Sequence, residues 1–280
     1  MHDPAGEPAE IDVRVLGPVE VAGTARPFSR AGSLELVVYL AMHRRGVTTE
    51  RWSAALWPER CPAASTLHST VSAARRALGR SAAGADHLPR WQGLLRLGPG
   101  VGCDQDRLAA LAGSADPGAW GAGLALVRGR PFEDLRWADW TVLEGHAAAV
   151  EEAVVRLAVR LAEHHLRRGD GAGAEWAARR GLRASPYDER LYRLLLLAAD
   201  QQGNPAGVEA AMADLVGLLG GTAHADGRPG RPGRPGRPLA MADAARWAHP
   251  RTVELYRALT RDRPPPSVPP AGCRVSSRHG

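Results

Sequence analysis

Residues 48–79 read TTERWSAALWPERCPAASTLHSTVSAARRALG, and this stretch carries the pattern of two consecutive helices. Thr48 or Thr49 can cap a short helix that Pro58 ends, and a longer helix can follow the loop and stop at Gly79. Apolar residues recur at helical spacing in both segments. They are Trp52, Ala55 and Leu56 in the first, and Leu67, Val71, Ala74 and Leu78 in the second. The stretch predicts a short helix, a loop and a second helix, each with one buried face.

The flanking segments complete a small domain around these helices. Residues 11–21 alternate apolar and polar positions on both sides of a Gly-Pro pair, which indicates a strand, a turn and a second strand. Ser33 can cap a helix that ends near Gly46. Residues 88–97 hold two short apolar stretches around Gln92 and Gly93, which favours a β-hairpin. Strands, three helices and a hairpin, in this order, predict a winged helix-turn-helix with an N-terminal sheet.

Charge divides the chain into a basic and an acidic part. The chain has no lysine, so its basic residues are arginines, whose guanidinium groups pair with phosphates and with guanine edges. Residues 11–103 hold 12 arginines and 6 acidic residues, a net charge of +6, whereas residues 104–226 hold 13 arginines and 18 acidic residues, a net charge of −5. This asymmetry favours a nucleic-acid-binding unit followed by a body that does not bind DNA.

The second helix of the quoted stretch has the polar face expected of a recognition helix. Opposite its apolar face, a helical wheel places serines, a histidine and two arginines, which suit contacts with phosphates and base edges. These residues are Ser65, His68, Ser69, Ser72, Arg75 and Arg76. We expect further contacts around this footprint from Arg44, Arg45, Arg80, Arg90 and Arg96. The alternative is an ordinary helix with a solvated polar face.

After residue 104 the strong periodicities are all helical, over residues 105–112, 118–127, 143–168, 171–184, 188–202 and 205–219. Residues 167–182 align with residues 201–216 at an offset of 34, which superposes Gly169 on Gly203 and Gly173 on Gly207. This period is typical of stacked tetratricopeptide helix pairs, although two Ala-rich amphipathic helices can also look alike by chance. The predicted fold class is therefore mainly α, with an α+β winged helix-turn-helix followed by an all-α tetratricopeptide-like domain.

The predicted organisation has six parts. Residues 1–10 are a disordered tail, 11–103 the DNA-binding domain and 104–222 the helical domain. Four Gly-Arg-Pro triplets make residues 223–240 a linker. Residues 241–261 contain a helix that we expect to pack back on the helical domain, and residues 262–280 are a Pro-rich disordered tail.

Three segments carry a resemblance to a known family. VRVLGPVEV near the N-terminus, AALWPERCPAASTLHSTVSAARRALG and CDQDRLAAL resemble the DNA-binding half of actinobacterial SARP-type regulators, which has the OmpR/PhoB winged-helix fold. GRPFEDLRWADW, the helical repeats and HPRTVELYRAL resemble the bacterial transcriptional activator domain that follows it in that family. The resemblance spans nearly the whole chain, from about residue 11 to about residue 259.

The resemblance also implies roles for particular residues. Residues 65–80 would read the major groove of promoter DNA, and residues 91–97 would form the wing. The loop between the two helices of the quoted stretch would face RNA polymerase, through Trp57, Pro58, Glu59, Arg60 and Pro62. Similar modules also occur at the cytoplasmic end of larger membrane proteins.

Other features argue against an enzyme, a metal site or a cofactor. The three cysteines lack metal-ligand spacing, and His164 and His165, as neighbours on a helix, diverge by about 100°. Four tryptophans fall at apolar periodic positions and are expected in the core, namely Trp52, Trp137, Trp140 and Trp176. There is no nucleotide motif, signal peptide or apolar run of membrane-spanning length, so we expect a cytoplasmic protein without membrane contact.

Two functions remain open. The first is a transcriptional regulator, expected to be an activator, that binds DNA through the winged helix and a protein or small-molecule partner through the helical domain. The second is a scaffold whose winged helix has lost DNA binding, as a module of a larger signalling system. Both predict the same fold.

Overall fold

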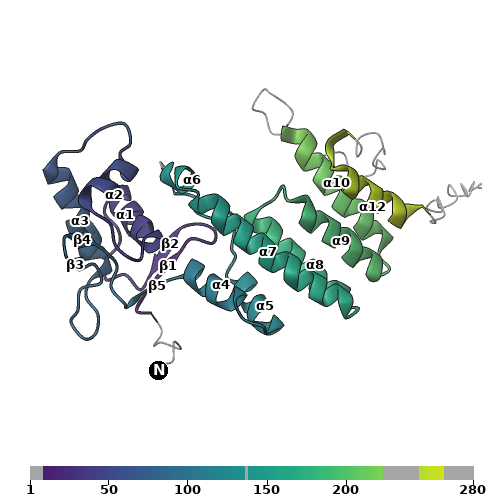
Figure 1. Cartoon of the computed structure of the whole chain (residues 1–280), viewed down its shortest axis with the longest axis horizontal. Coiled ribbons are helices and arrows are strands. Elements are labelled where there is room, and N and C mark those ends of the chain that lie inside the picture. The colour runs from purple at the N-terminus through teal and green to yellow at the C-terminus, as the bar shows by residue number, and fades with distance from the viewer. Residues whose placement is uncertain (1–8, 136–137, 223–245, 262–280) are drawn as a thin grey trace, which may run out of the picture.

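The computed structural model describes residues 9–135, 138–222 and 246–261, which form a small winged-helix unit followed by a row of helices (Figure 1). The expected N-terminal tail up to residue 8, the Gly-Arg-Pro linker and the C-terminal tail from residue 262 lie outside these residues. The predicted fold class is confirmed, since a small N-terminal sheet precedes a chain that is otherwise mainly helical. None of the helices within the described part is long and apolar enough to span a membrane.

The N-terminal sheet has the strand order β2-β1-β5. β1 (Ile11–Arg14) pairs antiparallel with β2 (Glu20–Ala22), as predicted. On its other edge β1 pairs in parallel with β5 (Val101–Cys103), a strand that the sequence did not predict. Asp104 follows β5 directly, and its buried carboxylate accepts hydrogen bonds from the backbone N–H groups of Val15 and Leu16 at 2.8 and 3.1 Å. The sheet is thereby joined to the first helix beyond it.

Three helices and a hairpin complete the winged-helix unit. They are α1 (Ala31–Met42), α2 (Thr49–Leu56), α3 (Ala64–Leu78), β3 (Arg90–Trp91) and β4 (Leu94–Leu95). Thr48 caps α2 by accepting from the backbone N–H of Arg51, which decides between the two threonines. Ser33 does not cap α1, because the helix begins two residues earlier and Ser33 lies buried inside it. Gln92 and Gly93 both have positive φ, as a tight two-residue hairpin turn requires.

The second half is a row of antiparallel helices that follows α4 (Asp104–Ala112) and α5 (Pro117–Ala125). Its members are α6 (Trp140–Leu143), α7 (His146–Arg167), α8 (Gly171–Ala184), α9 (Glu189–Gln201), α10 (Pro205–Thr222) and α12 (Pro250–Thr260). The single helix predicted over residues 143–168 is wrong at its start. Gly145 has a φ of 75°, which breaks the helical path and separates the short α6 from α7.

The 34-residue repeat has a physical basis at the starts of α8 and α10. Asp170 accepts a hydrogen bond from the backbone N–H of Gly173 at 2.8 Å, and Asn204 accepts from that of Gly207 at 2.9 Å. A Cβ atom at Gly173 would lie 2.4 Å from the Asp170 carboxylate, and one at Gly207 would lie 2.7 Å from the Asn204 amide. Each capping side chain therefore occupies the space beside its glycine, which explains why both positions lack a side chain.

The helix α12 packs across α9 and α10. Thr252, Val253 and Tyr256 are buried, and the Thr252 hydroxyl accepts a hydrogen bond from Arg193 on α9. The Tyr256 hydroxyl donates to the carboxylate of Glu209 on α10. Through these contacts α12 covers part of the surface of α9 and α10.

Replacing Val253 with alanine tests this packing. Loss of two buried methyl groups is expected to lower the free energy of unfolding by about 1–2 kcal/mol. Glu254→Ala, at an exposed position of the same helix, is the control and should stay within about 0.5 kcal/mol of wild type. Urea unfolding followed by circular dichroism measures both, and equal stabilities for the two variants would mean that α12 does not stabilise the domain.

Candidate nucleic-acid interface

The exposed face of α3 is the surface that the sequence predicts for DNA. The helix packs on α1 through Val71, Ala74 and Leu78, which are all buried. Helical spacing then places Ser65, and the residues three, four, seven and eleven positions after it, on the side of α3 that faces away from this buried face. Ser65, His68, Ser72 and Arg76 are exposed and Ser69 is half-buried, so five of the six predicted side chains form one stripe along α3.

Arg75 differs from the expectation that it projects outward with Arg76. Its side chain is half-buried, and its Nε donates a hydrogen bond of 2.9 Å to the backbone carbonyl of Leu88. The residue therefore holds α3 against the chain that leads into the hairpin. Arg30, which the sequence did not single out, lies at the same face, where its guanidinium donates to the Ser69 hydroxyl at 3.0 Å.

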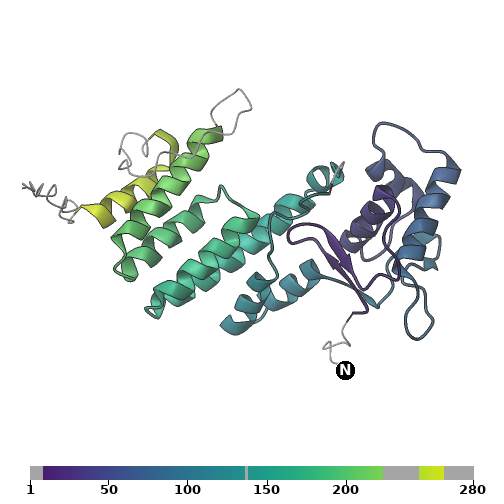
Figure 2. The same ribbon diagram turned by 180° about the vertical axis from the view of Figure 1, so that it is seen from behind.

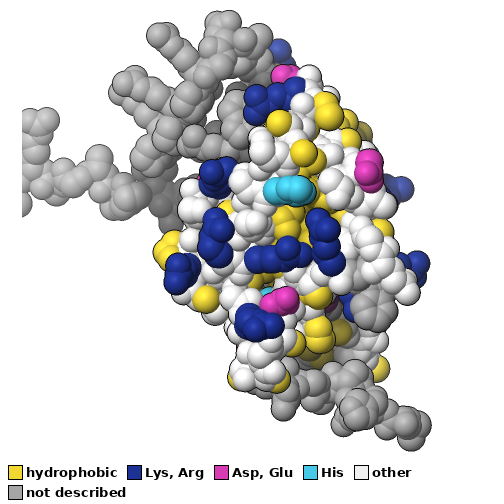
Figure 3. Space-filling model, turned by 90° about the vertical axis from the view of Figure 1, so that its left-hand side faces the viewer, with side chains coloured by type: hydrophobic (Ala, Val, Ile, Leu, Met, Phe, Trp, Pro, Cys, Tyr) yellow, Lys and Arg dark blue, Asp and Glu magenta, His cyan; other side chains and the backbone are white. Residues whose placement is uncertain are grey.

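The hairpin is fixed beside α3 by the loop between α1 and α2. Val47 and Leu95 exchange two backbone hydrogen bonds of 2.9 Å, so the hairpin cannot move independently of this loop. Arg45 in the loop and Arg90 on β3 are exposed, and Arg96, just after β4, is half-buried. Figure 3, which faces this end of the molecule, shows arginine side chains gathered around a partly apolar surface.

Two other predicted arginines are engaged by acidic partners. Arg80 forms an exposed ion pair with Asp86, with 2.9 Å between Nε and the carboxylate oxygen. Arg44 pairs with Asp106 on α4 and donates to the carbonyl of Val101, which turns it toward the sheet and away from the hairpin. Arg44 therefore contributes less to the basic surface than the sequence suggested.

The loop between α2 and α3 is anchored at its first residue. The Trp57 ring lies 6.0 Å from that of the buried Trp52, measured between ring centroids, and it is half-buried. Pro58, Glu59 and Arg60 are exposed, and Pro62 is half-buried. The loop thus presents a short polar segment that Trp57 anchors to the core.

The sequence predicts four tryptophans in the core. Trp52 and Trp140 are core residues as predicted, whereas Trp176 is 38% exposed, which corrects the expectation for that position. Trp137 lies outside the described residues.

A buried contact joins the winged-helix unit to the helical half. Trp140 on α6 is 2% exposed, and its indole N–H donates a hydrogen bond of 3.2 Å to the carboxylate of Glu35 on α1. Burial raises the pKa of Glu35 to about 7, against the lowering effect of the Trp140 hydrogen bond. The Tyr39 ring packs edge-on against Trp140 at 4.9 Å between centroids. Figures 1 and 2 show α6 at the end of the helical row that faces α1.

Next to Trp140 lies a cluster of polar residues that the sequence did not indicate, which we call the junction cluster. It consists of Tyr39, His43, Arg51, Glu144 and His146. The Glu144 carboxylate accepts from the Tyr39 hydroxyl at 3.0 Å and lies 2.9 Å from His43 Nε2. Burial raises the pKa of Glu144, but the Tyr39 hydrogen bond and the charges of His43 and Arg51 outweigh it, so the net pKa is lowered. Because Glu144 and His146 lie about a hundred residues after Tyr39, His43 and Arg51, no local spacing points to the cluster.

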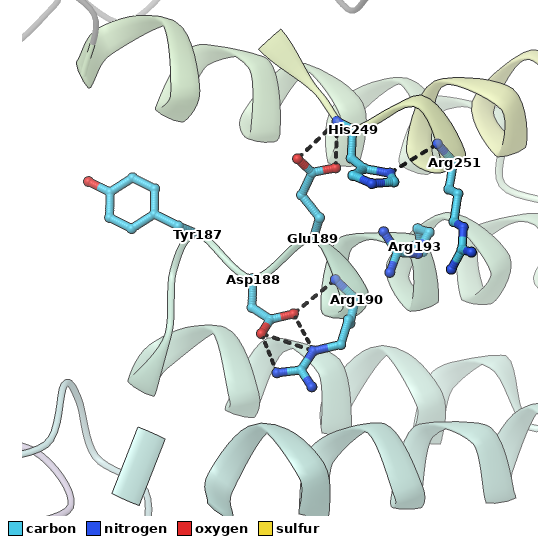
Figure 4. Close-up of a pocket in the computed structure, with 7 residues that line it drawn as sticks. All are labelled: Tyr187, Asp188, Glu189, Arg190, Arg193, His249 and Arg251. Atoms are coloured by element: carbon cyan, nitrogen blue, oxygen red, sulfur yellow. Dashed lines mark hydrogen bonds and ion pairs between the residues drawn. The ribbon is translucent and has the colours of Figure 1, made fainter. Parts of the chain in front are cut away.

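The helical half has a shallow hollow of about 360 Å³ where the starts of α9 and α12 meet (Figure 4). Its two acidic residues are engaged, since Asp188 pairs with Arg190 and Glu189 accepts from the backbone N–H of His249. Tyr187 and Arg251 are exposed at its edge. An aromatic ring and a guanidinium group beside a hollow offer contacts for a polar partner.

Comparisons with known proteins concern the helical half and the overall fold. Residues 105–219 match the family model of the bacterial transcriptional activator domain. Among solved structures, the chain is similar to Mycobacterium tuberculosis EmbR in complex with a low affinity phosphopeptide, with a TM-score of 0.56 and 23% sequence identity. That match covers 91% of this chain and 66% of the EmbR chain, so this chain spans less than two thirds of it. No curated protein sequence matches the chain. The comparisons thus show that residues 105–219 are similar to the bacterial transcriptional activator domain, and that the chain shares the fold of the solved structure.

Proposed function

We propose that the chain binds promoter DNA by placing α3 in the major groove. The observation that carries this proposal is the stripe of exposed short hydroxyl side chains, a histidine and Arg76 along α3. Serine side chains let the helix backbone approach the base edges closely, and the guanidinium group of Arg76 can donate two hydrogen bonds to a guanine. Because this unit has a net charge of +6, its field attracts the phosphate backbone.

In this proposal the residues around α3 position the helix on the duplex. Arg45, Arg80, Arg90 and Arg96 contact phosphates, because they lie on the loops and the hairpin that flank α3. Arg75 acts through its hydrogen bond to Leu88, which keeps the hairpin at a fixed distance from the recognition helix. The exposed residues 58–60 face RNA polymerase, which makes activation the expected sign of regulation.

The helical half, in the same proposal, binds a partner and not DNA. Its net charge of −5 repels phosphate, and the hollow between α9 and α12 provides an exposed tyrosine and arginine for a protein or small molecule. Since Trp140 and Glu35 join the two halves through a buried contact, a partner bound to the helical half can alter how the winged helix is held. The chain acts as a regulator and not as an enzyme.

The DNA interface is tested by replacing Arg76 with alanine. The full chain first selects bound fragments from sheared genomic DNA, and the most enriched fragment then serves as the probe. Loss of one arginine contact to a base is expected to weaken binding by about 1–3 kcal/mol, which is roughly 5- to 150-fold. Fluorescence anisotropy at several salt concentrations measures the affinity.

Arg14→Ala is the matched control, since it also removes one positive charge but lies on β1, where Arg14 pairs with Asp12 and Glu20. Its affinity for the probe should change by less than about threefold, as expected for a charge outside the contact surface. If Arg76→Ala binds as tightly as Arg14→Ala, α3 is not the reading helix. If the folded wild-type chain selects no fragment even at low salt, the scaffold alternative is favoured.

A further inference from the structure

The junction cluster places three potential metal ligands around one point. His43 Nε2, a Glu144 carboxylate oxygen and a His146 ring nitrogen all lie within 4.8 Å of one another. His43 follows the last residue of α1, whereas Glu144 and His146 flank Gly145 between α6 and α7. The left-handed conformation of Gly145 turns the chain sharply, so that side chains two residues apart meet the histidine of the other domain.

The spacing of the ligand atoms fits a small tetrahedral ion. Glu144 Oε2 lies 2.9 Å from His43 Nε2 and 3.5 Å from His146 Nε2. Metal-to-ligand distances of about 2.0–2.2 Å, as in zinc sites, put neighbouring ligand atoms of a tetrahedron roughly 3.3 Å apart. The two separations lie within about 0.4 Å of this value, and the two histidine nitrogens lie no more than 4.8 Å apart.

Hydrogen bonds already orient two of the three ligands. His43 Nδ1 lies 2.8 Å from the backbone carbonyl of Tyr39, which can only accept, so Nδ1 carries a proton. Nε2 faces Glu144 Oε2 at 2.9 Å, where an ion would take the place of the Nε2 proton. The Tyr39 hydroxyl donates to Glu144 Oε1, which leaves Oε2 for the centre of the cluster. Outer-shell hydrogen bonds of this kind fix the ligands of known metal sites.

The third potential ligand, His146, has a buried ring nitrogen without a hydrogen bond in the described part of the chain. His146 Nε2 is buried and has no hydrogen-bond partner among the described residues, although it faces the Glu144 carboxylate at 3.5 Å. A buried polar atom without a partner is costly, and a bound ion would remove that cost.

Arg51 is the competing cation. Its Nη2 lies 3.3 Å from His43 Nε2 and 3.6 Å from Glu144 Oε2, so a guanidinium group now partly neutralises the carboxylate. The Arg51 side chain is 59% exposed and extends from α2 at the surface, so it can turn into solvent when an ion enters. Its position marks the cluster as a place where positive charge is favourable.

We propose that His43, Glu144 and His146 bind a divalent ion of the zinc class, which links the winged-helix unit to the activator domain. Two imidazoles and one carboxylate are a ligand set that zinc uses, with the fourth position left for water. The ion would hold α1 and α7 together beside the Trp140 contact. The proposal concerns the junction alone and does not depend on whether α3 binds DNA.

Cobalt(II) provides the test, because a tetrahedral cobalt site absorbs visible light strongly. The purified full chain, stripped of metal and held at neutral pH, should bind one cobalt ion per chain with a tetrahedral spectrum that zinc abolishes. His43→Ala and His146→Ala should each weaken binding by more than the roughly 10- to 100-fold that loss of an outer-shell partner costs, and Tyr39→Phe should fall within that smaller range. His164→Ala removes a histidine from α7 away from the junction and should bind like wild type.

Thermal unfolding in the same samples shows whether the variants fold and whether the ion joins the two halves. Zinc should raise the Tm of the wild-type chain and of His164→Ala, but not that of a folded His146→Ala. The proposal is wrong if the folded wild-type chain gives no tetrahedral cobalt spectrum. It is also wrong if His43→Ala and His146→Ala bind cobalt as tightly as His164→Ala, because the ion would then lie elsewhere.

Discussion

Replacing Trp140 with alanine is expected to lower the free energy of unfolding by about 3–5 kcal/mol, the largest effect of the substitutions considered for this chain. The indole is 2% exposed and packs against Tyr39 of the winged helix and Phe132 of the connecting segment. Its removal leaves a cavity between the two halves and takes the hydrogen bond from the buried Glu35. Urea unfolding of the full chain measures the change.

Two further variants separate the causes. Trp140→Phe keeps an aromatic ring but removes the N–H donor. The smaller ring lowers the free energy of unfolding by itself, and the loss of the hydrogen bond to Glu35 should lower it by about 1–3 kcal/mol more. Trp176→Ala, at a tryptophan that is 38% exposed on α8, is the control and should cost clearly less than Trp140→Ala. Equal losses for Trp140→Ala and Trp176→Ala would mean that the junction does not hold the two halves together.

Replacing Glu35 with glutamine is expected to make the chain more stable at pH 8 but not at pH 4.5. Burial raises the pKa of Glu35 from its ordinary value of 4.5 to about 7 in the folded chain, so the folded state keeps a proton that the unfolded state loses. The stabilising effect of this proton is complete below pH 4.5 and is lost as the pH rises through 7. As the pH rises from 4.5 to above 7, the free energy of unfolding of the wild-type chain should fall by about 3 kcal/mol relative to that of Glu35→Gln.

The measurement is the difference in unfolding free energy between the variant and wild type at several pH values, which cancels the titration of other groups. Glu50→Gln gives a control of opposite sign. Hydrogen bonds from its own backbone N–H and from Thr48 lower the pKa of Glu50, so its charge stabilises the folded chain above pH 4.5 and that effect is lost on acidification. A flat difference curve for Glu35→Gln would show that Glu35 is ionised in the folded chain.

Helical periodicity predicted the elements whose packing is local. The helix α8 begins at Gly171 and ends at Ala184, as the pattern of apolar residues indicates, and α3 ends at the predicted Gly79 stop. Amphipathic spacing suffices in these cases because each helix buries one face against its neighbours in the chain.

The sequence did not predict the elements that depend on contacts with residues far away in the chain. β5 has three residues and a glycine at its centre, and it is a strand only because β1 lies beside it, some ninety residues earlier in the chain. The same reason hid the junction cluster, in which His43 follows α1 whereas Glu144 and His146 flank the break between α6 and α7. For the DNA surface, a helical wheel placed Arg75 and Arg76 together, but it does not show that the Leu88 carbonyl draws Arg75 inward.

Several contacts cross residue 103, where the sequence places the end of the DNA-binding domain. The backbone carbonyl of Val15 accepts from the N–H of Phe132, and Trp140 packs on α1, so residues beyond 103 cover the winged-helix core. A fragment of residues 11–103 would expose this apolar surface to water. Binding experiments therefore require the full chain.

Photo-crosslinking from α3 tests the proposed DNA contact most directly. A photoreactive amino acid replaces Ser72 on the exposed stripe in one variant and Trp176 on α8 of the helical half in another, and each full-length variant is irradiated with the selected DNA fragment. The proposal predicts a crosslink to DNA from position 72 and none from position 176. An absent crosslink from position 72 in a variant that still binds the fragment, or equal crosslinking from both positions, would contradict it.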